Sequence, residues 1–456
     1  MAEPRVVIVG AGPAGIRAAA CLVQAGLRPV VIDEGARRGG QIYRRQPDNF
    51  TRSADVLYGT EATKARAVHE TFDSLIDRID YRPDTLAWNV YEGVLHAVSG
   101  NRTAALPFDA LLIASGATDR LMPVPGWTLP GVYSLGAAQI ALKAQACAIG
   151  SKVVFLGTGP LLYLVAYQYA KAGADVAAVL DTSPLGARLR ALPSLLARPD
   201  NLLKGLSYLL RLHRQGILVR TSVTPVAIEG DASGPRAVVV EHHGERMEIA
   251  CDAVGLGYHL RPETQLADLA RCEFRFDAST RQWLPIVDQD GRSSVKGVYL
   301  AGDGTRLLGA DGAEIAGQLA AYALLADHGY GVSADTVTHL RRQQQRMDRF
   351  RRGLAMAFPW PAHLAAKLPD DALICRCEAI RVGELRRTAC DLEASELNRA
   401  KAFSRVGMGR CQGRYCGHAA AEVVAHASGA SIESVGRLRG QAPVKPLPIA
   451  TTRVTS

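Results

Sequence analysis

The stretch Arg5-Val6-Val7-Ile8-Val9-Gly10-Ala11-Gly12-Pro13-Ala14-Gly15 decides the fold of this chain. Residues 5–10 form a short β-branched run, which predicts a buried parallel strand. The small residues of 14–25 predict the helix that follows, and residues 29–33 predict the next strand. A complete G-x-G-x-x-G between a strand and a helix is the context that a dinucleotide motif requires. The sequence therefore predicts a Rossmann-type βαβ unit.

Each part of this unit has a physical role toward a nucleotide. The first glycine permits the tight turn, the second lets the backbone approach a pyrophosphate, and the third lets helix and strand pack closely. The helix N-terminus offers free N–H groups to the phosphates. An acid after the second strand accepts from ribose hydroxyls, and Glu34 has the right offset. The expected contacts are Gly10, Gly12, Pro13, Ala14, Gly15, Asp33 and Glu34.

Composition narrows the class of protein. The chain has 456 residues, which at about 150 residues per domain suggests roughly three structural units. Its net charge is +9, but no basic run is interleaved with aromatic residues, so we expect no nucleic-acid partner. We see neither a secretory pattern nor an apolar run of about 18 residues. These features predict a cytoplasmic protein with at most peripheral contact with the inner face of the cytoplasmic membrane.

A second βαβ unit is predicted in the middle of the chain. Its glycine motif opens with Gly157 and Gly159, and Asp181 follows its second strand, where it could hold a ribose. Leu162 replaces the third glycine and would crowd the packing of helix on strand. Two interpretations stay open: a site for NAD(H), and a Rossmann fold whose site is lost or altered. The elements are residues 152–157, 161–172 and 175–180. For the first glycine motif, an adenine nucleotide other than FAD also stays open.

Three further motifs resemble the two-dinucleotide-binding-domain flavoproteins, the thioredoxin-reductase-like class. They are Gly39-Gly40-Gln41, Ala114-Ser115-Gly116 (with Ser for the usual Thr) and Leu300-Ala301-Gly302-Asp303-Gly304. In that class the N-terminal motif binds the ADP part of FAD, and the late Asp contacts the ribityl–pyrophosphate region. Over about residues 1–330 the resemblance implies bound FAD. The additional contacts it implies are Gly40, Gln41, Ala114, Ser115, Gly116, Gly302 and Asp303.

Four cysteines stand in two close pairs near the C-terminus, Cys375-x-Cys377 and Cys411-x4-Cys416. A [2Fe-2S] cluster takes four thiolates, two at each iron. A C-x-C pair is too tight for many zinc knuckles, which prefer two to four intervening residues. The spacing favours a [2Fe-2S] cluster held by all four, with zinc and a metal-free structural site as alternatives. The module resembles the bacterioferritin-associated-ferredoxin-like domain, although that domain usually ends C-x-x-C.

A narrower resemblance spans nearly the whole chain. The run from Gly407 to Cys416, with Cys375-Arg376-Cys377 upstream, looks like the larger flavin subunit of opine oxidases. The B subunits of hydrogen cyanide synthases and the alpha subunits of proline and hydroxyproline dehydrogenases are similar. The resemblance implies an FAD and [2Fe-2S] electron-transfer subunit whose partner, an amino-acid-oxidase-like FAD (beta) subunit, oxidises an opine, proline, hydroxyproline or related amine. It also implies a respiratory or quinone acceptor and leaves room for a small additional subunit.

Two other functions stay open. The first is a self-sufficient NAD(P)H-dependent reductase that feeds its cluster or a partner. The second is a nucleotide-binding scaffold subunit, since wider relatives hold an adenine nucleotide and share an FMN at the interface between chains. No catalytic residue is assigned, because the sequence has no Ser-His-Asp or paired-carboxylate pattern worth defending.

The predicted fold class is α/β: an FAD-binding Rossmann-type core, an inserted second Rossmann-type domain and a small C-terminal four-cysteine domain. The predicted segments are 1–122 (FAD-binding domain, first part), 123–258 (inserted NAD-binding-like domain), 259–345 (FAD-binding domain, second part), 346–369 (linker), 370–440 ([2Fe-2S] domain) and 441–456 (tail).

Three smaller features remain. Residues 339–352 are Arg-rich and predict a basic amphipathic helix, either a linker or subunit contact or, less favoured, a helix lying on an anionic membrane. We expect a structural rather than cofactor-binding role for His259. The remaining cysteines are predicted to be buried core thiols: Cys21, Cys147, Cys251, Cys272 and Cys390.

Overall fold

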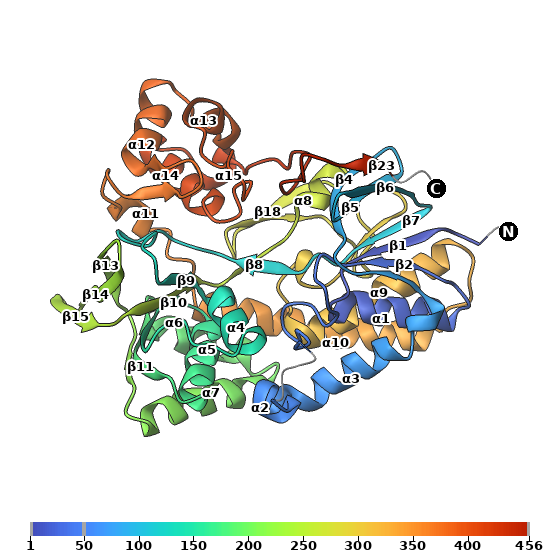
Figure 1. Cartoon of the computed structure of the whole chain (residues 1–456), viewed down its shortest axis with the longest axis horizontal. Coiled ribbons are helices and arrows are strands. Elements are labelled where there is room, and N and C mark those ends of the chain that lie inside the picture. Colours follow the sequence, from blue (N-terminus) through green and yellow to red (C-terminus); the bar gives the residue numbers. More distant parts are fainter. Residues whose placement is uncertain (1–2, 48–51, 454–456) are drawn as a thin grey trace.

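The N-terminal glycine motif lies at the centre of a five-stranded parallel sheet of order β20-β7-β1-β2-β3. The computed structural model describes residues 3–47 and 52–453; the ends of the predicted segments 1–122 and 441–456 thus lie partly outside the described residues. Helices α1 (Pro13–Gln24) and α9 (Gly309–Asp327) pack against each other beside this sheet (Figure 1). Its strands are β1 Val6–Val9, β2 Val30–Ile32, β3 Asp80–Arg82, β7 Ala110–Ile113 and β20 Val298–Leu300.

A second five-stranded parallel sheet has the order β12-β11-β10-β16-β9. One face is covered by α4 (Leu135–Ala144), α5 (Pro160–Lys171) and α7 (Pro199–Arg214), whose apolar residues share a core with its strands. Its strands are β9 Val132–Ser134, β10 Lys152–Thr158, β11 Asp175–Asp181, β12 Leu218–Arg220 and β16 Ala253–Tyr258.

The two sheets are joined by a pair of neighbouring crossings. The chain leaves the first sheet through β8 (Ala117–Asp119) and returns through β17 (Leu260–Pro262), which pair antiparallel. The second sheet is therefore an insertion in the first domain, and the predicted α/β architecture is confirmed.

Smaller antiparallel sheets and short helices extend both units. β23 returns from the C-terminal end to pair with β6, so the tail crosses back to the first domain (Figure 1). The antiparallel strands are β4 Leu86–Tyr91, β5 Val94–Ser99, β6 Arg102–Pro107, β13 Thr224–Asp231, β14 Gly234–His242, β15 Glu245–Ala250, β18 Phe274–Asp277 and β19 Gln282–Pro285, while β23 Thr452–Arg453 runs parallel to β6. The other helices are α2 Ala54–Tyr58, α3 Ala62–Asp73, α6 Leu185–Leu195 and α8 Gln265–Leu269, with short 3₁₀ turns at Gly59–Glu61, Ile76–Arg78 and Gly302–Gly304.

The Arg-rich segment forms the long helix α10 (Ala334–Ala357), which crosses from the first domain to the second (Figure 1). Its apolar side is buried against α6 and α9, and a Cβ on Gly353 would stand 3.0 Å from the backbone N of Leu195. Arg341 pairs with Asp290 at 2.5 Å. The interpretation as a packed linker helix agrees with this arrangement, and the apolar side is not free for a membrane. The predicted boundary between 345 and 346 falls inside the helix.

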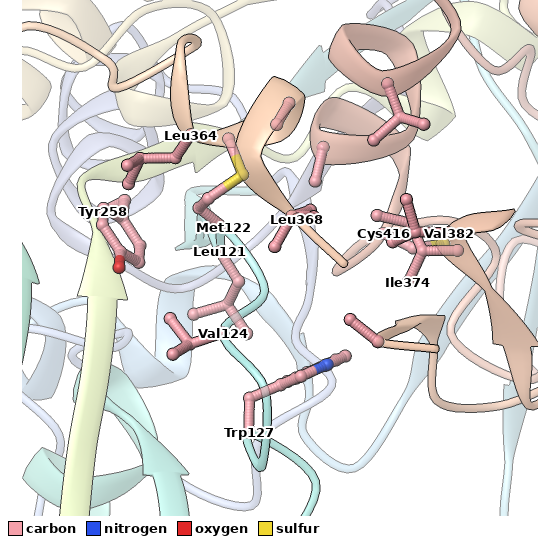
Figure 2. Packing of buried hydrophobic residues seen from close by; sticks show 14 of the residues in the cluster. Leu121, Met122, Val124, Trp127, Tyr258, Leu364, Leu368, Ile374, Val382 and Cys416 are labelled. Atoms are coloured by element: carbon pink, nitrogen blue, oxygen red, sulfur yellow. The ribbon is translucent and has the colours of Figure 1, made fainter. Parts of the chain in front are cut away.

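The C-terminal module shares its hydrophobic core with the inserted domain. Leu121, Met122, Val124 and Trp127 meet Leu364, Leu368, Ile374, Val382 and Cys416 in one buried cluster (Figure 2). The indole Nε1 of Trp127 donates to the carbonyl of Leu373 at 2.7 Å. The module's elements are α11 Leu364–Lys367, β21 Leu373–Cys375, β22 Ile380–Arg381, α12 Val382–Asp391, α13 Leu397–Ser404, α14 Gly417–Ser428 and α15 Ile432–Val435.

Candidate functional site

The first glycine motif forms a narrow cradle at the carboxyl end of β1. A Cβ on Gly15 would overlap the carbonyl oxygen of Gly10, so only glycine lets α1 pack this closely on the turn. Gly40 has φ +63°, and a Cβ there would stand 2.9 Å from the Cα of Gly12. The predicted Gly39-Gly40 turn therefore faces the first motif, and the two backbones line the start of α1. Pro13 is the first residue of that helix, with no acidic residue in its first turn.

The two acids after β2 have different environments. Asp33 accepts from the backbone N–H of Ala11 at 2.5 Å and of Gly35 at 2.6 Å, so it braces the glycine turn. Burial raises the pKa of this carboxyl. Glu34 is exposed and pairs with Lys445 of the C-terminal tail. Of the two, Glu34 remains accessible to a ribose, and the tail lies beside it.

The second and third flavin-type motifs meet next to this cradle. Ala114 follows β7, and its N–H bonds to the carbonyl of Val9 at 2.8 Å. A Cβ on Gly304 would stand 2.6 Å from Ser115 Oγ, so the two motifs touch. Asp303 accepts from the N–H groups of Leu308 at 2.7 Å and Gly309 at 3.0 Å.

Two other predicted contacts, Gln41 and Gly116, form hydrogen bonds within the protein. Gln41 is exposed, and its Oε1 accepts from Arg44 at 2.6 Å. Gly116 has φ +72°, and its carbonyl accepts from the N–H of Glu263 at 2.9 Å. The glycine cradle and the accessible acid Glu34 fit a dinucleotide such as FAD.

The four predicted ligand cysteines come together from two loops. Cys375 ends β21 and Cys377 follows it, while Cys411 precedes α14 and Cys416 caps it. The thiol of Cys416 is in hydrogen-bonding contact with Cys375 and Cys411, and Cys377 with Cys411. The sulfurs therefore form a continuous chain of four.

Thiol contacts and backbone N–H groups favour ionised sulfur at two positions. Hydrogen bonding from Cys416 lowers the pKa of Cys375 to about 6, helped by N–H groups of Gly407 and Glu378. It also lowers the pKa of Cys411, helped by the N–H groups of Tyr415 and Gly413. The thiolate is the form that binds a metal.

The donor chemistry suits a [2Fe-2S] centre, which takes two pairs of thiolates. Across residues 3–47 and 52–453, no group of three or more His, Cys, Asp or Glu side chains is arranged around a metal-sized position. The four thiols are in hydrogen-bonding contact in sequence, Cys375 with Cys416, Cys416 with Cys411 and Cys411 with Cys377.

A buried ion pair joins the flavin-type motifs to the cysteine loop, and no sequence motif pointed to it. Ser115 Oγ donates to the carbonyl of Glu263 at 2.6 Å. The Glu263 carboxylate pairs with Arg414 at 2.8 Å, and Arg414 also donates to the carbonyl of Cys411 at 3.2 Å. The only hint was the position of Arg414 between two ligand cysteines. Residues far apart in the chain thus connect both candidate redox sites.

The second glycine motif is surrounded by buried protein side chains. Leu162 is fully buried in the core between sheet and helices, so the bulky replacement is accommodated. Gly157 lies near the end of its strand and Gly159 precedes α5. Asp181 is also fully buried and accepts from Tyr163, Ser183 and Arg188, which leaves it facing the protein.

The remaining cysteines divide by position. Cys21, Cys251 and Cys272 are buried, in agreement with the core-thiol prediction. Cys147 and Cys390 are exposed, so that prediction is wrong for both. Cys147 lies in the loop after α4, and Cys390 lies at the exposed end of α12, where its thiol reaches the carbonyl of Ala427 at 3.3 Å.

A parallel sheet with this glycine cradle, an inserted second Rossmann-type sheet and a late Gly-Asp motif define a flavin-dependent oxidoreductase. The family described as pyridine nucleotide-disulphide oxidoreductase matches residues 4–317, and the chain belongs to it. The sarcosine oxidase A3 domain matches residues 378–455, which include Cys411 and Cys416.

Full-length relatives are known. The chain is 37% identical to the A subunit of opine oxidase from Agrobacterium tumefaciens (strain Ach5), over 98% of this chain and 90% of the relative. It is 31% identical to the hydrogen cyanide synthase protein HcnB of Pseudomonas protegens, over 97% and 96%. The crystal structure of L-proline dehydrogenase from P. horikoshii has a TM-score of 0.69 at 20% identity, covering 98% of this chain and 79% of that one. The predicted resemblance is confirmed.

In the described part of the chain, no helix combines the length and apolar character that crossing a membrane requires.

Proposed function

We propose that this chain is the FAD- and [2Fe-2S]-containing electron-transfer subunit of a hetero-oligomeric amine dehydrogenase or oxidase. The substrates proposed for the assembly are opines, proline, hydroxyproline or a related amino acid. The observation that carries the proposal is the juxtaposition of four contacting cysteines and the flavin-type motifs through Ser115, Glu263 and Arg414. The full-length similarity to the A subunit of opine oxidase supports the same assignment.

The proposed roles follow from position. The first glycine motif and the Gly39-Gly40 turn hold the pyrophosphate, and Glu34 accepts from the adenosine ribose. Cys375, Cys377, Cys411 and Cys416 hold the cluster, within a domain that we propose to be residues 370–440. A flavin takes up two electrons and a [2Fe-2S] centre one, so together they supply a relay from a two-electron donor to a one-electron acceptor.

The partner in this proposal is an amino-acid-oxidase-like FAD protein that oxidises the amine, and the acceptor is a quinone or another respiratory component. A relay chain needs no substrate pocket of its own. This is consistent with the absence from its sequence of an evident catalytic constellation.

Visible spectroscopy with iron and sulfide analysis on anaerobically purified protein tests the proposal. We expect a flavin band with about two irons and two sulfides per chain. The Cys411→Ser and Cys416→Ser variants should lose iron and keep flavin. As controls, serine substitutions at the exposed Cys147 and Cys390 should keep both iron and flavin.

Three results would redirect the assignment. Finding zinc and no iron in the purified protein would show that the four cysteines do not hold a [2Fe-2S] cluster. A colourless protein that binds an adenine nucleotide would favour the scaffold function with a shared interface FMN. Bleaching by NADH or NADPH alone would make the chain a reductase in its own right.

A further inference from the structure

The second dinucleotide fold has a defined place for a ligand, the crevice at the carboxyl ends of its parallel strands. β10 runs into Gly159 and α5, β11 ends at Asp181, and β16 is followed by His259. A dinucleotide would lie across these three strand ends, with its pyrophosphate at the start of α5 and a ribose on Asp181.

Asp181 is fully engaged within the protein. One carboxylate oxygen accepts from the N–H of Ser183 at 2.7 Å. The other accepts from the Tyr163 hydroxyl at 2.7 Å and pairs with Arg188 at 2.6 Å. The side chain has no exposed surface. A ribose would have to displace a buried charged partner to reach it.

Phe358, from the end of α10, stands among these groups. Its ring centroid is 6.3 Å from the rings of both Tyr163 and His259. The guanidinium carbon of Arg188 lies 5.1 Å from its centroid, within cation–π range. Its carbonyl oxygen accepts from Nε2 of His259. Phe358 thus contacts His259, which follows β16, and two helix residues beside the cleft, Tyr163 of α5 and Arg188 of α6.

The start of α5 is covered as well. A Cβ on Gly159 would stand 3.2 Å from Nδ1 of His259, so the imidazole lies beside the helix N-terminus. His259 has φ +68°, a left-handed conformation that a non-glycine residue adopts only where surrounding contacts hold it. The imidazole stands where a pyrophosphate would approach the helix.

From this geometry we infer that the second dinucleotide cleft is closed by the chain's own side chains, with Phe358 in the ligand's position, and that it does not take NAD(H). The fold is retained and the site is filled. This inference concerns nucleotide binding alone and does not depend on the proposed amine donor.

The segment that closes the cleft also seats the cysteine module. Pro359 joins Phe358 directly to Trp360, whose indole donates to Glu422 of α14 at 3.0 Å. The guanidinium of Arg120 lies 3.6 Å from the Trp360 ring centroid. Since α14 begins next to Cys416, opening the cleft would disturb the anchor of a cluster loop.

The first experiment titrates the intact purified holoprotein with NADH, and separately with NAD⁺, by calorimetry. We expect no saturable binding up to millimolar concentration. Micromolar binding of either nucleotide would overturn the inference whether or not the flavin is reduced.

The second experiment removes the closing groups with Phe358→Ala combined with Arg188→Ala. We expect NADH affinity to rise by at least about tenfold over the wild type. The matched control is Phe403→Ala with Arg190→Ala, an exposed ring and an exposed arginine elsewhere, which should gain nothing. A folded double variant that still fails to bind would show that these side chains do not close the cleft.

A readout on the wild type covers the case in which that variant does not fold. Hydrogen exchange of residues 157–163 should be the same with and without millimolar NADH. Slowed exchange in this segment on adding NADH would place the nucleotide in the cleft and overturn the inference.

Discussion

Gly15 is the residue at which a single methyl group has the largest predicted effect on the flavin site. An added Cβ would overlap the carbonyl oxygen of Gly10, so α1 would have to move away from the turn. We expect Gly15→Ala to lose most of its bound flavin, measured as flavin absorbance per chain after desalting.

Gly205→Ala is the matched control for that substitution. Gly205 lies in α7, is exposed, and an added Cβ would meet nothing within 4 Å. Alanine in an open helix position should keep full flavin content and raise the free energy of unfolding by ~0.5–1 kcal/mol. Equal flavin content in both variants would contradict the close-packing role of Gly15.

His259 gives a pH dependence with a defined sign. Burial lowers its pKa to about 4, with Arg120 adding to the shift and the Phe358 carbonyl and Asp181 opposing it. An unfolded histidine titrates near about 6.5. The neutral ring therefore contributes stability above about pH 6.5, and this contribution is lost as the pH falls through about 4.

We expect chemical unfolding of the wild type to show this loss, up to about 3 kcal/mol between pH 7 and 4. His259→Gln keeps a donor for the Phe358 carbonyl and does not titrate, so its decline over the same range should be smaller. Identical pH profiles of the wild type and the variant would contradict a lowered pKa of His259 in the folded protein.

At the scale of single residues, the sequence predicts the glycine motifs well but not the hydrogen-bond partners of the acidic residues near them. The glycines could be placed because their roles are local to one turn. The roles of Asp33 and Asp181 depended on neighbours from other elements: Asp33 braces Ala11 and Gly35, and Asp181 is held by Tyr163 and Arg188. No local pattern distinguishes an acid that faces a ribose from one that faces the protein.

Between elements, the pair Glu263–Arg414 ties the segment after β17 to the cysteine loop. The two side chains are 13% and 8% exposed, so removing one charge leaves the other buried and unpaired. We expect Glu263→Gln to cost ~3–5 kcal/mol and to lower the ratio of iron to flavin, measured on the same sample. The exposed pair Arg246–Glu229 gives the control, since Glu229→Gln should cost at most ~1 kcal/mol.

A loss of flavin and iron in equal proportion would count against this link, because it would indicate general unfolding rather than a loosened cysteine loop.

The element that the sequence predicted least well is α10. The sequence predicts a basic amphipathic helix over residues 339–352 with a domain boundary between 345 and 346, whereas the helix spans Ala334–Ala357 and packs against α6. A basic helix with one apolar side looks the same whether that side meets a membrane or another helix. In this structure the apolar side of α10 meets a helix rather than a membrane. Gly353 allows this contact, because the absence of a side chain lets α6 approach closely.

Across the whole molecule, the shared core of the inserted domain and the cysteine module decides how the protein unfolds. One hydrophobic cluster runs from β10, β11 and β16 through Leu121–Trp127 into α12 and α14. Elements that share a buried core gain and lose protection together. We therefore expect the inserted domain and the cysteine module to unfold together.

Tyr169 allows a test of this coupling from a distance. It is fully buried on the opposite, helix-covered face of the second sheet and belongs to the separate core beneath α4, α5 and α7. Tyr169→Ala should cost ~3–5 kcal/mol, as truncation of a buried aromatic residue does. If the inserted domain and the module unfold as one unit, native-state hydrogen exchange in α12 and α14 will accelerate as much as in β10 and β16. Acceleration confined to the inserted domain would show that the module keeps its structure alone, and that the cluster shown in Figure 2 is an interface between two independently stable units.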